Sequence, residues 1–560
     1  MEGGTTMSYL TRLITRPTHQ RDRLSPDQIQ NSEGGYIFEA DMWTRLRRFL
    51  ILGSEGGSFY AGERDLTREA TEALDACIAA DGDRVVSEII AISQAGRAPK
   101  NDPAIYALAR CAAASDPATR RAALDALPLV CRTATHLFIF VTIVRAWRGW
   151  GRALRRAVGS WYAAQPVERI AYQAVKYRQR DGVTHRDVLR LAHPAAAVSA
   201  GNPTLGVAPD QARLFEWIVR GGDTAGLPRI VEGFSRVQAA ASPADAAELV
   251  REFDLPREAV NPDHLTSPLV WEALLERMPV TAMIRNLATM TRVGLISPGS
   301  DAATVIAERL ANSEQLTKAR VHPIALLIAQ RTYASGRGLR SSTTWTPVTR
   351  IVDALDDAFY RAFGNVTPAG QRLMLALDVS GSMAGSFIAG APGLSAREAS
   401  AAMALVTLAS ERDAEVVGFH SGRGSWIARK KGRFPGRADG LAPLPLSPRQ
   451  RLADAVRSVS DLPFGGTDCA LPMLYATAKG REVDTFVVYT DSETWAGDIH
   501  PVEALRRYRR ATGIPARLIV CGMVANRFTI ADPTDAGMLD VVGFDTSTPE
   551  VISGFARGDL

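Results

Sequence analysis

The residues of this sequence best suited to chemistry form the motif D-x-S-x-S, which follows an unbroken apolar run. Asp378, Ser380 and Ser382 supply one carboxylate and two hydroxyl groups at alternate positions. In a loop after a strand, such side chains can direct their oxygens to one point. A site with few carboxylates and room for water suits Mg²⁺ among divalent cations. The motif therefore predicts a cation site, although an aspartate that caps a turn would have the same pattern.

Two distant residues strengthen this prediction. Thr467, in the glycine-rich segment "FGGTDC", would add a hydroxyl group, and Asp491, which ends the apolar run "TFVVYTD", would add a second carboxylate. The carboxyl ends of parallel strands meet at one edge of a sheet, so Asp378 and Asp491 are expected to approach each other there. We therefore expect Mg²⁺ to be bound by Asp378, Ser380, Ser382, Thr467 and Asp491.

The residues leave three functions open for such a site. A phosphatase of the haloacid dehalogenase type also ends its first strand with an aspartate, but it needs a second aspartate where Ser380 stands. A nuclease would need a water-activating base or several clustered acids, and only Asp468 and Glu493 are near in sequence. The third function is adhesion, in which an acidic side chain of a partner completes the coordination of the ion.

These side chains need a scaffold, and the segment 369–560 alternates between two kinds of pattern. Apolar runs typical of buried strands occupy 372–378, 414–420, 485–491, 516–523 and 538–544. Apolar residues at helical spacing occupy 396–411, 448–461, 467–480 and 501–513. This alternation predicts an α/β fold with a mostly parallel, doubly wound sheet.

In the part of the chain that precedes residue 369, apolar residues recur at helical spacing only. From about Leu66 to Phe363, helical segments are separated by short junctions such as Asp102-Pro103 and Asp116-Pro117, and nearly nothing predicts a strand. Helix pairs repeated over this length predict α-helical repeats of the HEAT type. We therefore expect a tail at 1–24, the helical repeats at 25–368 and the α/β domain at 369–560.

Composition excludes several classes of protein. The chain has 560 residues, of which 46% are hydrophobic and 22% are charged, as in soluble globular proteins of more than one domain. The most apolar stretch, "HLFIFVTIV" (136–144), is shorter than the roughly 20 residues that span a bilayer. Five scattered cysteines without a CxxC pair indicate neither disulfides nor a zinc site. We expect a cytoplasmic protein with no membrane partner.

Positive charge is concentrated in the helical part. Within 371–560, 21 Lys and Arg balance 21 Asp and Glu, so the net charge of +5 lies elsewhere. Within 145–190, eleven Arg and Lys are interleaved with Trp and Tyr and accompany only three acids, a mixture that can contact phosphates and stack on bases. Arg148, Arg152 and Arg156, spaced by four, would share one helical face. A solvated helix surface would have a similar composition.

The motifs together resemble a known family. A D-x-S-x-S motif with a distant threonine and a distant aspartate is the metal-ion-dependent adhesion site (MIDAS) of von Willebrand factor A-type domains, and 369–560 resembles that fold closely. Longer motifs resemble the Ro autoantigen family, whose TROVE module is a ring of helical repeats closed by an A-type domain. These motifs are "NSEGGYIFEADMWTRLRRFLILGSEGGSFY", "KYRQRDGVTHRDVLRLAHP", "GGTDCALPMLYA", "YTDSETWAG" and "IPARLIVCGM" with "FTIADPTDAGMLDVVGFDT". Frequent alanine and arginine are in keeping with a bacterial member.

This resemblance implies RNA binding without catalysis. Ro proteins bind small noncoding Y RNAs on the outside of the ring and take single-stranded ends of misfolded noncoding RNAs into its hole, which implies a role in RNA quality control. Bacterial relatives cooperate with an exoribonuclease, such as polynucleotide phosphorylase, through a Y-like RNA. The resemblance therefore implies these partners and a monomeric ring.

The resemblance also implies which residues contact RNA. The segment "KYRQRDGVTHRDVLRLAHP" matches the region that the family uses for Y RNA, which makes Lys176, Arg180 and His193 expected contacts. His185 and Arg186 lie in the same turn and are expected to join them. On one predicted helix, Lys176 and Arg180 would share a face suited to phosphate oxygens. His193 could instead be a capping or buried histidine.

Overall fold

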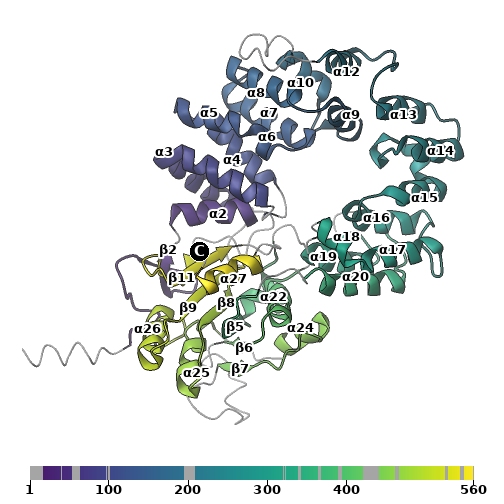
Figure 1. Ribbon diagram of the computed structural model, residues 1–560. Coiled ribbons are helices and arrows are strands. Elements are labelled where there is room, and N and C mark those ends of the chain that lie inside the picture. The colour runs from purple at the N-terminus through teal and green to yellow at the C-terminus, as the bar shows by residue number, and fades with distance from the viewer. Residues whose placement is uncertain are drawn as a thin grey trace, which may run out of the picture. The chain divides into compact units, whose positions relative to one another are not determined.

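The chain divides into two compact units in the computed structural model (Figure 1). Met1–Ala73 and Val366–Leu560 form the first, which we call the α/β unit, and Leu74–Asn365 form the second, which we call the helical unit. The structure describes residues 17–39, 41–52, 63–95, 98, 101–194, 208–319, 321, 323–338, 342–363, 368–388, 394–420, 440–460, 466–523, 528–542 and 548–558.

A six-stranded sheet forms the centre of the α/β unit. Its strands follow the order β11-β9-β8-β5-β6-β7, and all neighbours are parallel except β6 and β7. β5 and β8 are buried along their whole length, as expected for central strands of a doubly wound sheet. The strands are β5 (Leu373–Asp378), β6 (Ala414–Phe419), β7 (Leu441–Pro443), β8 (Thr485–Thr490), β9 (Arg517–Gly522) and β11 (Met538–Val542). All five strands predicted from the sequence are present, whereas β7 was not predicted.

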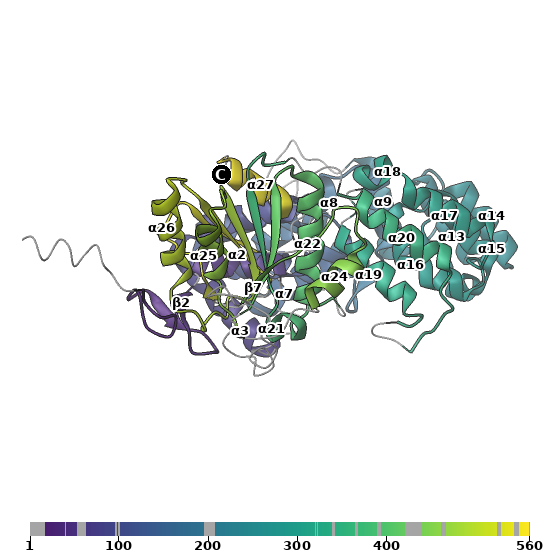
Figure 2. The ribbon, with the colours of Figure 1, turned by 90° about the horizontal axis from the view of Figure 1, so that it is seen from below.

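Helices cover both faces of this sheet (Figure 2). α25 and α26 pack side by side on one face, and α22 packs with α24 and α27 on the other. α2 packs on β11, where Arg48 and Asp540 form a buried ion pair of 2.6 Å. The helices of the unit are α2 (Met42–Leu52), α21 (Gly381–Gly385), α22 (Ala396–Ser410), α24 (Leu452–Ser460), α25 (Leu471–Lys479), α26 (Pro501–Thr512) and α27 (Thr548–Arg557).

The N-terminal segment is part of the α/β unit. β1 (Gln28–Gln30) and β2 (Tyr36–Glu39) form a hairpin, and β2 pairs with β10 (Phe528–Thr529). The sequence analysis assigned residues from 25 onward to the helical repeats, whereas the structure groups them with the α/β unit up to residue 73. Of the predicted tail, residues 1–16 lie outside the described residues, but Gln20 is completely buried. Because β2 pairs with a two-residue strand almost 490 positions further along the chain, no local pattern in the sequence predicts that this segment joins the α/β unit.

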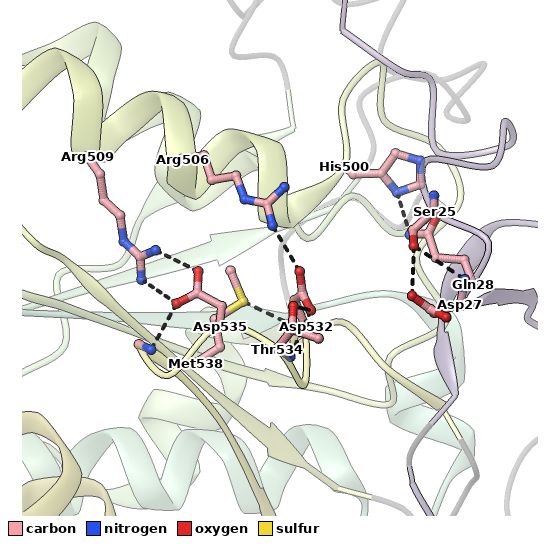
Figure 3. Close-up of polar contacts among 11 residues, drawn as sticks. Ser25, Asp27, Gln28, His500, Arg506, Arg509, Asp532, Thr534, Asp535 and Met538 are labelled. Atoms are coloured by element: carbon pink, nitrogen blue, oxygen red, sulfur yellow. Dashed lines mark hydrogen bonds and ion pairs between the residues drawn. The ribbon is translucent and has the colours of Figure 1, made fainter.

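Polar contacts attach α26 to two other parts of the α/β unit (Figure 3). Two arginines of α26 pair with aspartates in the loop between β10 and β11, and a histidine just before α26 contacts the N-terminal segment. The pairs are Arg506 with Asp532 (3.0 Å), Arg509 with Asp535 (2.6 Å) and His500 with Gln28 (3.4 Å). α26 and the histidine before it therefore connect the N-terminal segment to the loop between β10 and β11.

The helical unit is a succession of helices that pack on their neighbours (Figure 1). The predicted junctions are confirmed, because α4 begins at Asp102 and Asp116 caps α5 by accepting a hydrogen bond from the Thr119 amide (2.7 Å). The helices from its N-terminal side are α3 (Glu63–Ala95, which begins in the other unit), α4 (Asp102–Ala113), α5 (Pro117–Asp125), α6 (Leu127–Val130), α7 (Ala134–Arg148), α8 (Arg152–Ala163), α9 (Val167–Lys176) and α10 (His185–Ala192). They continue with α12 (Pro209–Arg220), α13 (Arg229–Gln238), α14 (Pro243–Phe253), the 3₁₀ helices η1 (Arg257–Ala259) and η2 (Pro262–Thr266), α15 (Pro268–Arg277), α16 (Val280–Arg292), α17 (Asp301–Ala311), α18 (Ser313–Lys318), α19 (Pro323–Ala334) and α20 (Thr349–Arg361).

α3 consists of two helical stretches that are separated by a kink at Asp81, whose φ of −160° and ψ of 88° are not helical. One detail of this unit was not predicted from the sequence. A small hairpin of β3 (Gln179–Arg180) and β4 (Val183–Thr184) separates α9 from α10. Within the described residues, no helix has both the length and the apolar character needed to cross a membrane.

Candidate cation site and nucleic-acid interface

The D-x-S-x-S motif lies where β5 ends, as predicted. Asp378 is the last residue of β5, and its Oδ1 accepts a hydrogen bond from the backbone amide of Ser380 (2.9 Å). The hydroxyl groups of Ser380 and Ser382 are 3.1 Å apart at the start of α21. All three side chains are buried. The alternate positions of the motif therefore bring their oxygens together.

Asp491 reaches the same edge of the sheet from the neighbouring strand. β8 runs parallel to β5 and ends at Thr490, whose hydroxyl donates to Asp378 Oδ2 (2.7 Å). Asp491 follows immediately and forms a hydrogen bond with the Ser382 side chain. The next residue, Ser492, has a left-handed backbone (φ +64°), which is uncommon for a residue other than glycine.

Thr467 belongs to a loop that is bound to the loop after Asp491. The carbonyl oxygen of Thr467 accepts hydrogen bonds from the backbone amides of Trp495 and Ala496, both at 3.1 Å. Its side chain is buried, with 3% of its surface exposed. The five predicted ligands therefore come from three loops that are joined by hydrogen bonds.

The electrostatics of this cluster favour a cation. Burial raises the pKa of Asp378 and of Asp491, and the negative charge of Asp378 raises that of Asp491 further. Arg397 of α22 opposes this effect at Asp378, and its guanidinium group donates to the carbonyl oxygens of Val379 and Ser380, both at 2.7 Å. Two buried carboxylates beside hydroxyl groups form a donor set that fits a hard divalent cation. In the described part of the chain, no cluster of three His, Cys, Asp or Glu side chains is found.

The N-terminal segment stabilises the loops that carry these ligands. The Gln20 amide nitrogen donates to Asp468 Oδ1 (2.8 Å) and to the carbonyl oxygen of Ile499 (2.9 Å). Its amide oxygen accepts from the Thr494 hydroxyl (2.8 Å) and from the Gly497 backbone amide (3.1 Å). One buried side chain thus joins the loops of Thr467 and Asp491.

A nuclease at this site would depend on Asp468 and Glu493, but both of these side chains have other partners. Asp468 accepts the hydrogen bond from Gln20, and Glu493 accepts one from the Ser32 backbone amide at 2.9 Å. Burial raises the pKa of Glu493 to about 7. Both carboxylates therefore connect the N-terminal segment to the site.

The sequence analysis did not single out Gln20 or Arg397. Arg397 is a lone arginine in a helix that is otherwise largely apolar, and a buried charge in such a position needs a partner. This signal could have identified it. Gln20 has no comparable signal, because its partners lie about 450 residues further along the chain.

Four of the five predicted RNA contacts lie on or near the surface of the helical unit. Lys176 is the half-buried last residue of α9, whereas Arg180, Arg186 and His193 are exposed. The Lys176 ammonium group lies over the rings of Tyr172 and Tyr177, at 5.2 and 5.4 Å, and donates to the Tyr172 hydroxyl at 2.9 Å. The exposed residues Arg180, Arg186 and His193 lie on β3, on α10 and at the end of α10.

The expectation that Lys176 and Arg180 share one helix is wrong. α9 ends at Lys176, and Arg180 belongs to the β3–β4 hairpin, whose turn residues Asp181 and Gly182 both have positive φ. Asp-Gly is the preferred sequence for this turn, so the signal was present. Because the hairpin is short, both side chains still belong to one region of α9, the hairpin and α10.

The structure contradicts the expectation that His185 is a surface contact. His185 is 3% exposed, its Nδ1 lies 2.8 Å from the Tyr162 hydroxyl, and its Nε2 lies 3.3 Å from the Gln173 carbonyl oxygen. Together with Val188, Leu189 and Ala192 it forms the buried face of α10, at the helical spacing of three and four. Helical periodicity could therefore have placed this histidine in the core.

Comparisons with known proteins agree with this architecture. A TROVE domain model matches residues 29–213 and 255–335, and a Ro60 vWA domain model matches residues 372–556. The "RNA-binding protein RO60" of Deinococcus radiodurans is 42% identical over 550 residues, which cover 98% of both chains. The chain belongs to the Ro60 family.

Other members of the Ro60 family support the same assignment. The "RNA-binding protein RO60" of Caenorhabditis elegans is 35% identical over 98% of this chain and 93% of its own. The crystal structure of the Deinococcus radiodurans RO (RSR) protein matches this structure with a TM-score of 0.70 and 41% sequence identity. The match covers 92% of this chain and 99% of the chain in that crystal structure. The predicted combination of TROVE helical repeats and an A-type α/β domain is thus confirmed.

Replacement of Gln20 tests its role in joining the loops. Gln20→Ala leaves buried polar groups of Asp468, Thr494 and Gly497 without this partner, so the free energy of unfolding should fall by at least about 2 kcal/mol. Chemical denaturation measures this. Gln30→Ala, at an exposed position of the same segment, is the control and should change stability little. Equal stability of the two variants would contradict the proposed role.

His185 should make the stability of the protein depend on pH. Burial lowers its pKa to about 4, so between pH 6.5 and 4 only the unfolded chain takes up the proton and stability falls as the pH falls, by up to about 3 kcal/mol. Melting temperatures of the His185→Phe variant should show a shallower slope over this range than those of the parent protein. Tyr162→Phe, which removes the hydrogen bond but keeps the histidine, should retain the slope. Identical slopes in all three proteins would refute this explanation.

Proposed function

We propose that this protein binds RNA without catalysing a reaction on it, through the surface formed by the end of α9, the β3–β4 hairpin and the end of α10. The observation that carries the proposal is the cluster of Lys176 with Tyr172 and Tyr177, which is followed along the chain by the exposed side chains of Arg180 and His193. Relatives at 42% and 35% identity carry the name RNA-binding protein, which supports it.

The chemistry of this cluster suits RNA. Burial is the largest single influence on the pKa of Lys176 and lowers it, but the hydrogen bond to Tyr172 and the nearby Tyr172, Tyr177 and Glu258 together raise the pKa above its usual value. The charge is therefore retained at neutral pH. Tyr172 is 37% exposed and offers a ring for stacking next to this charge. Phosphate contacts from basic groups and stacking on aromatic rings are the two main modes of binding to unpaired RNA.

We further propose that the RNA is a Y-like small noncoding RNA, and that the protein acts in the cytoplasm as a monomer in the quality control of misfolded noncoding RNA. An exoribonuclease such as polynucleotide phosphorylase would be its partner. The family membership supports this more detailed role.

A second function is proposed for the carboxylate cluster of the α/β unit. Asp378, Ser380, Ser382, Thr467 and Asp491 would bind Mg²⁺ as a MIDAS-type site, and an acidic group of a protein partner would complete the coordination. The convergence of two buried carboxylates and several hydroxyl groups at one sheet edge supports this proposal.

The RNA proposal predicts a loss of affinity when the basic surface is neutralised. Lys176→Ala combined with Arg180→Ala should weaken binding of a labelled stem-loop RNA at least tenfold. The slope of log K against log salt concentration should fall by about 1 to 2, because two phosphate contacts are lost. Fluorescence anisotropy at several salt concentrations measures both effects. Arg292→Ala with Lys318→Ala, two exposed basic residues elsewhere in the helical unit, is the control, and equal affinities of the two double variants would reject the proposal.

The cation proposal predicts a separable effect. Asp378→Asn should reduce Mg²⁺ affinity at least tenfold in isothermal titration calorimetry, because it removes one of two carboxylates. RNA affinity should stay nearly unchanged, since the proposed RNA surface is in the other unit. The control is Asp413→Asn, at an exposed aspartate of the same unit. Unchanged Mg²⁺ binding in Asp378→Asn would disprove the site, and a parallel loss of RNA binding would show that the α/β unit takes part in RNA contact.

A further inference from the structure

The helical unit contains an arginine-lined cavity that the proposed RNA surface does not include. Its volume is about 720 Å³, within the range of pockets that bind ligands. It is formed by the end of α4, by α5, by the turn from α7 to α8 and by α8. We call it the arginine groove.

Five arginines and a single acid, Asp125, line the arginine groove. The arginines are Arg120 and Arg121 of α5, Arg148 at the end of α7, and Arg152 and Arg156 of α8. The sequence analysis placed the last three on one helical face. Instead, Arg148 is separated from the other two by a turn in which Gly149 has a φ of +75°, yet all three line the same cavity.

Most of these arginines form no hydrogen bond or ion pair within the described part of the protein. Arg120 donates to the carbonyl oxygens of Ala114 and Ser115 at the end of α4. The other four guanidinium groups have no hydrogen bond or ion pair with any residue that the structure describes. Arginines nearby behave differently, since Arg110 pairs with Asp75 at 2.7 Å and Arg155 donates to the Ala192 carbonyl oxygen at 3.2 Å. The positive charge of the groove is therefore left for a ligand.

The shape and position of the groove indicate what kind of anion it accepts. Guanidinium groups bind phosphate oxygens in a bidentate manner, and here they come from three helices, so they can contact several phosphates in a row. Carbon atoms of Val144, Leu154 and Trp161 form part of the walls, which suits the sugars and bases between the phosphates. A cavity of this volume is too small to enclose a duplex.

The groove is also connected to the proposed RNA surface. α8 presents Arg152 and Arg156 to the groove, while Arg155 on the same helix binds the carbonyl oxygen of Ala192, next to His193. Trp150, in the turn before α8, donates to the Leu191 carbonyl oxygen at 3.0 Å. One RNA molecule could therefore contact both regions.

We propose that the arginine groove binds the phosphates of a single RNA strand, as a second contact region beside the surface around Lys176. This inference rests on the proposed RNA-binding function. The strand would be held through Arg121, Arg148, Arg152 and Arg156, with no requirement for a particular base sequence, because phosphate contacts do not distinguish bases.

The test uses the full-length protein and labelled oligouridine, measured by fluorescence anisotropy over a range of salt concentrations. Arg152→Ala with Arg156→Ala should weaken binding at least tenfold and lower the salt slope by about 1.4, the value for two phosphate contacts on a single strand. Arg152→Lys with Arg156→Lys should weaken binding less than the double alanine variant and leave the salt slope nearly unchanged, because the charges remain while the bidentate hydrogen bonds are lost. The control is Arg285→Ala with Arg292→Ala, which removes two exposed arginines from α16. All four side chains are exposed and form no hydrogen bond or ion pair with the residues that the structure describes, so the variants should fold normally.

The outcomes separate the groove from the wider function. If the parent protein binds RNA and the groove variant binds it equally well, the groove proposal is wrong and the RNA-binding function stands. If the parent protein binds neither oligouridine nor a stem-loop RNA, both proposals fail. Displacement of oligouridine by polyglutamate at equal charge concentration would assign the groove to an acidic polypeptide and overturn its assignment to RNA.

Discussion

The constraint on which the α/β unit depends is the burial of two carboxylates, Asp378 and Asp491, at one edge of its sheet. Removing such charges from water costs several kcal/mol each, so the surrounding structure must offset that cost. Hydroxyl groups, backbone amides and the charge of Arg397 do so from within the protein, and a divalent cation would complete the balance. The same requirement extends outward to Gln20, because the loops beside these carboxylates are held in place by its amide group.

Much of the α/β fold could be predicted from the sequence because its signals are local. An apolar run between turn residues is sufficient to predict a buried strand, and parallel strands must end at a common edge, which placed Asp378 and Asp491 together. The N-terminal sheet could not be found in this way, since its strands are only two to four residues long and β10, which pairs with β2, lies almost 490 residues further along the chain. The pairing of strands that are distant along the chain depends on contacts within the folded unit, so a short stretch of sequence does not predict it.

The positions of the residues in the basic surface were also only partly predictable from the sequence. The residue types indicated RNA contact, and the structure places Lys176 at the end of α9 and His193 as the exposed cap at the end of α10. The relative placement of Lys176 and Arg180 depended on one Asp-Gly turn, and the burial of His185 depended on the phase of one helix. The arginine groove was beyond prediction, because its five arginines come from three helices whose packing no local pattern specifies.

The contact of Gln20 with Asp468 also bears on how the protein is made. These residues are 448 positions apart, so a ribosome that adds 5–20 residues per second needs roughly 20–90 s between them. During this interval the N-terminal strands have no sheet to join, while the helical unit, encoded in between, is already emerging. The α/β unit is therefore completed only near the end of synthesis, and a fragment that starts after the helical repeats would lack the segment that closes it.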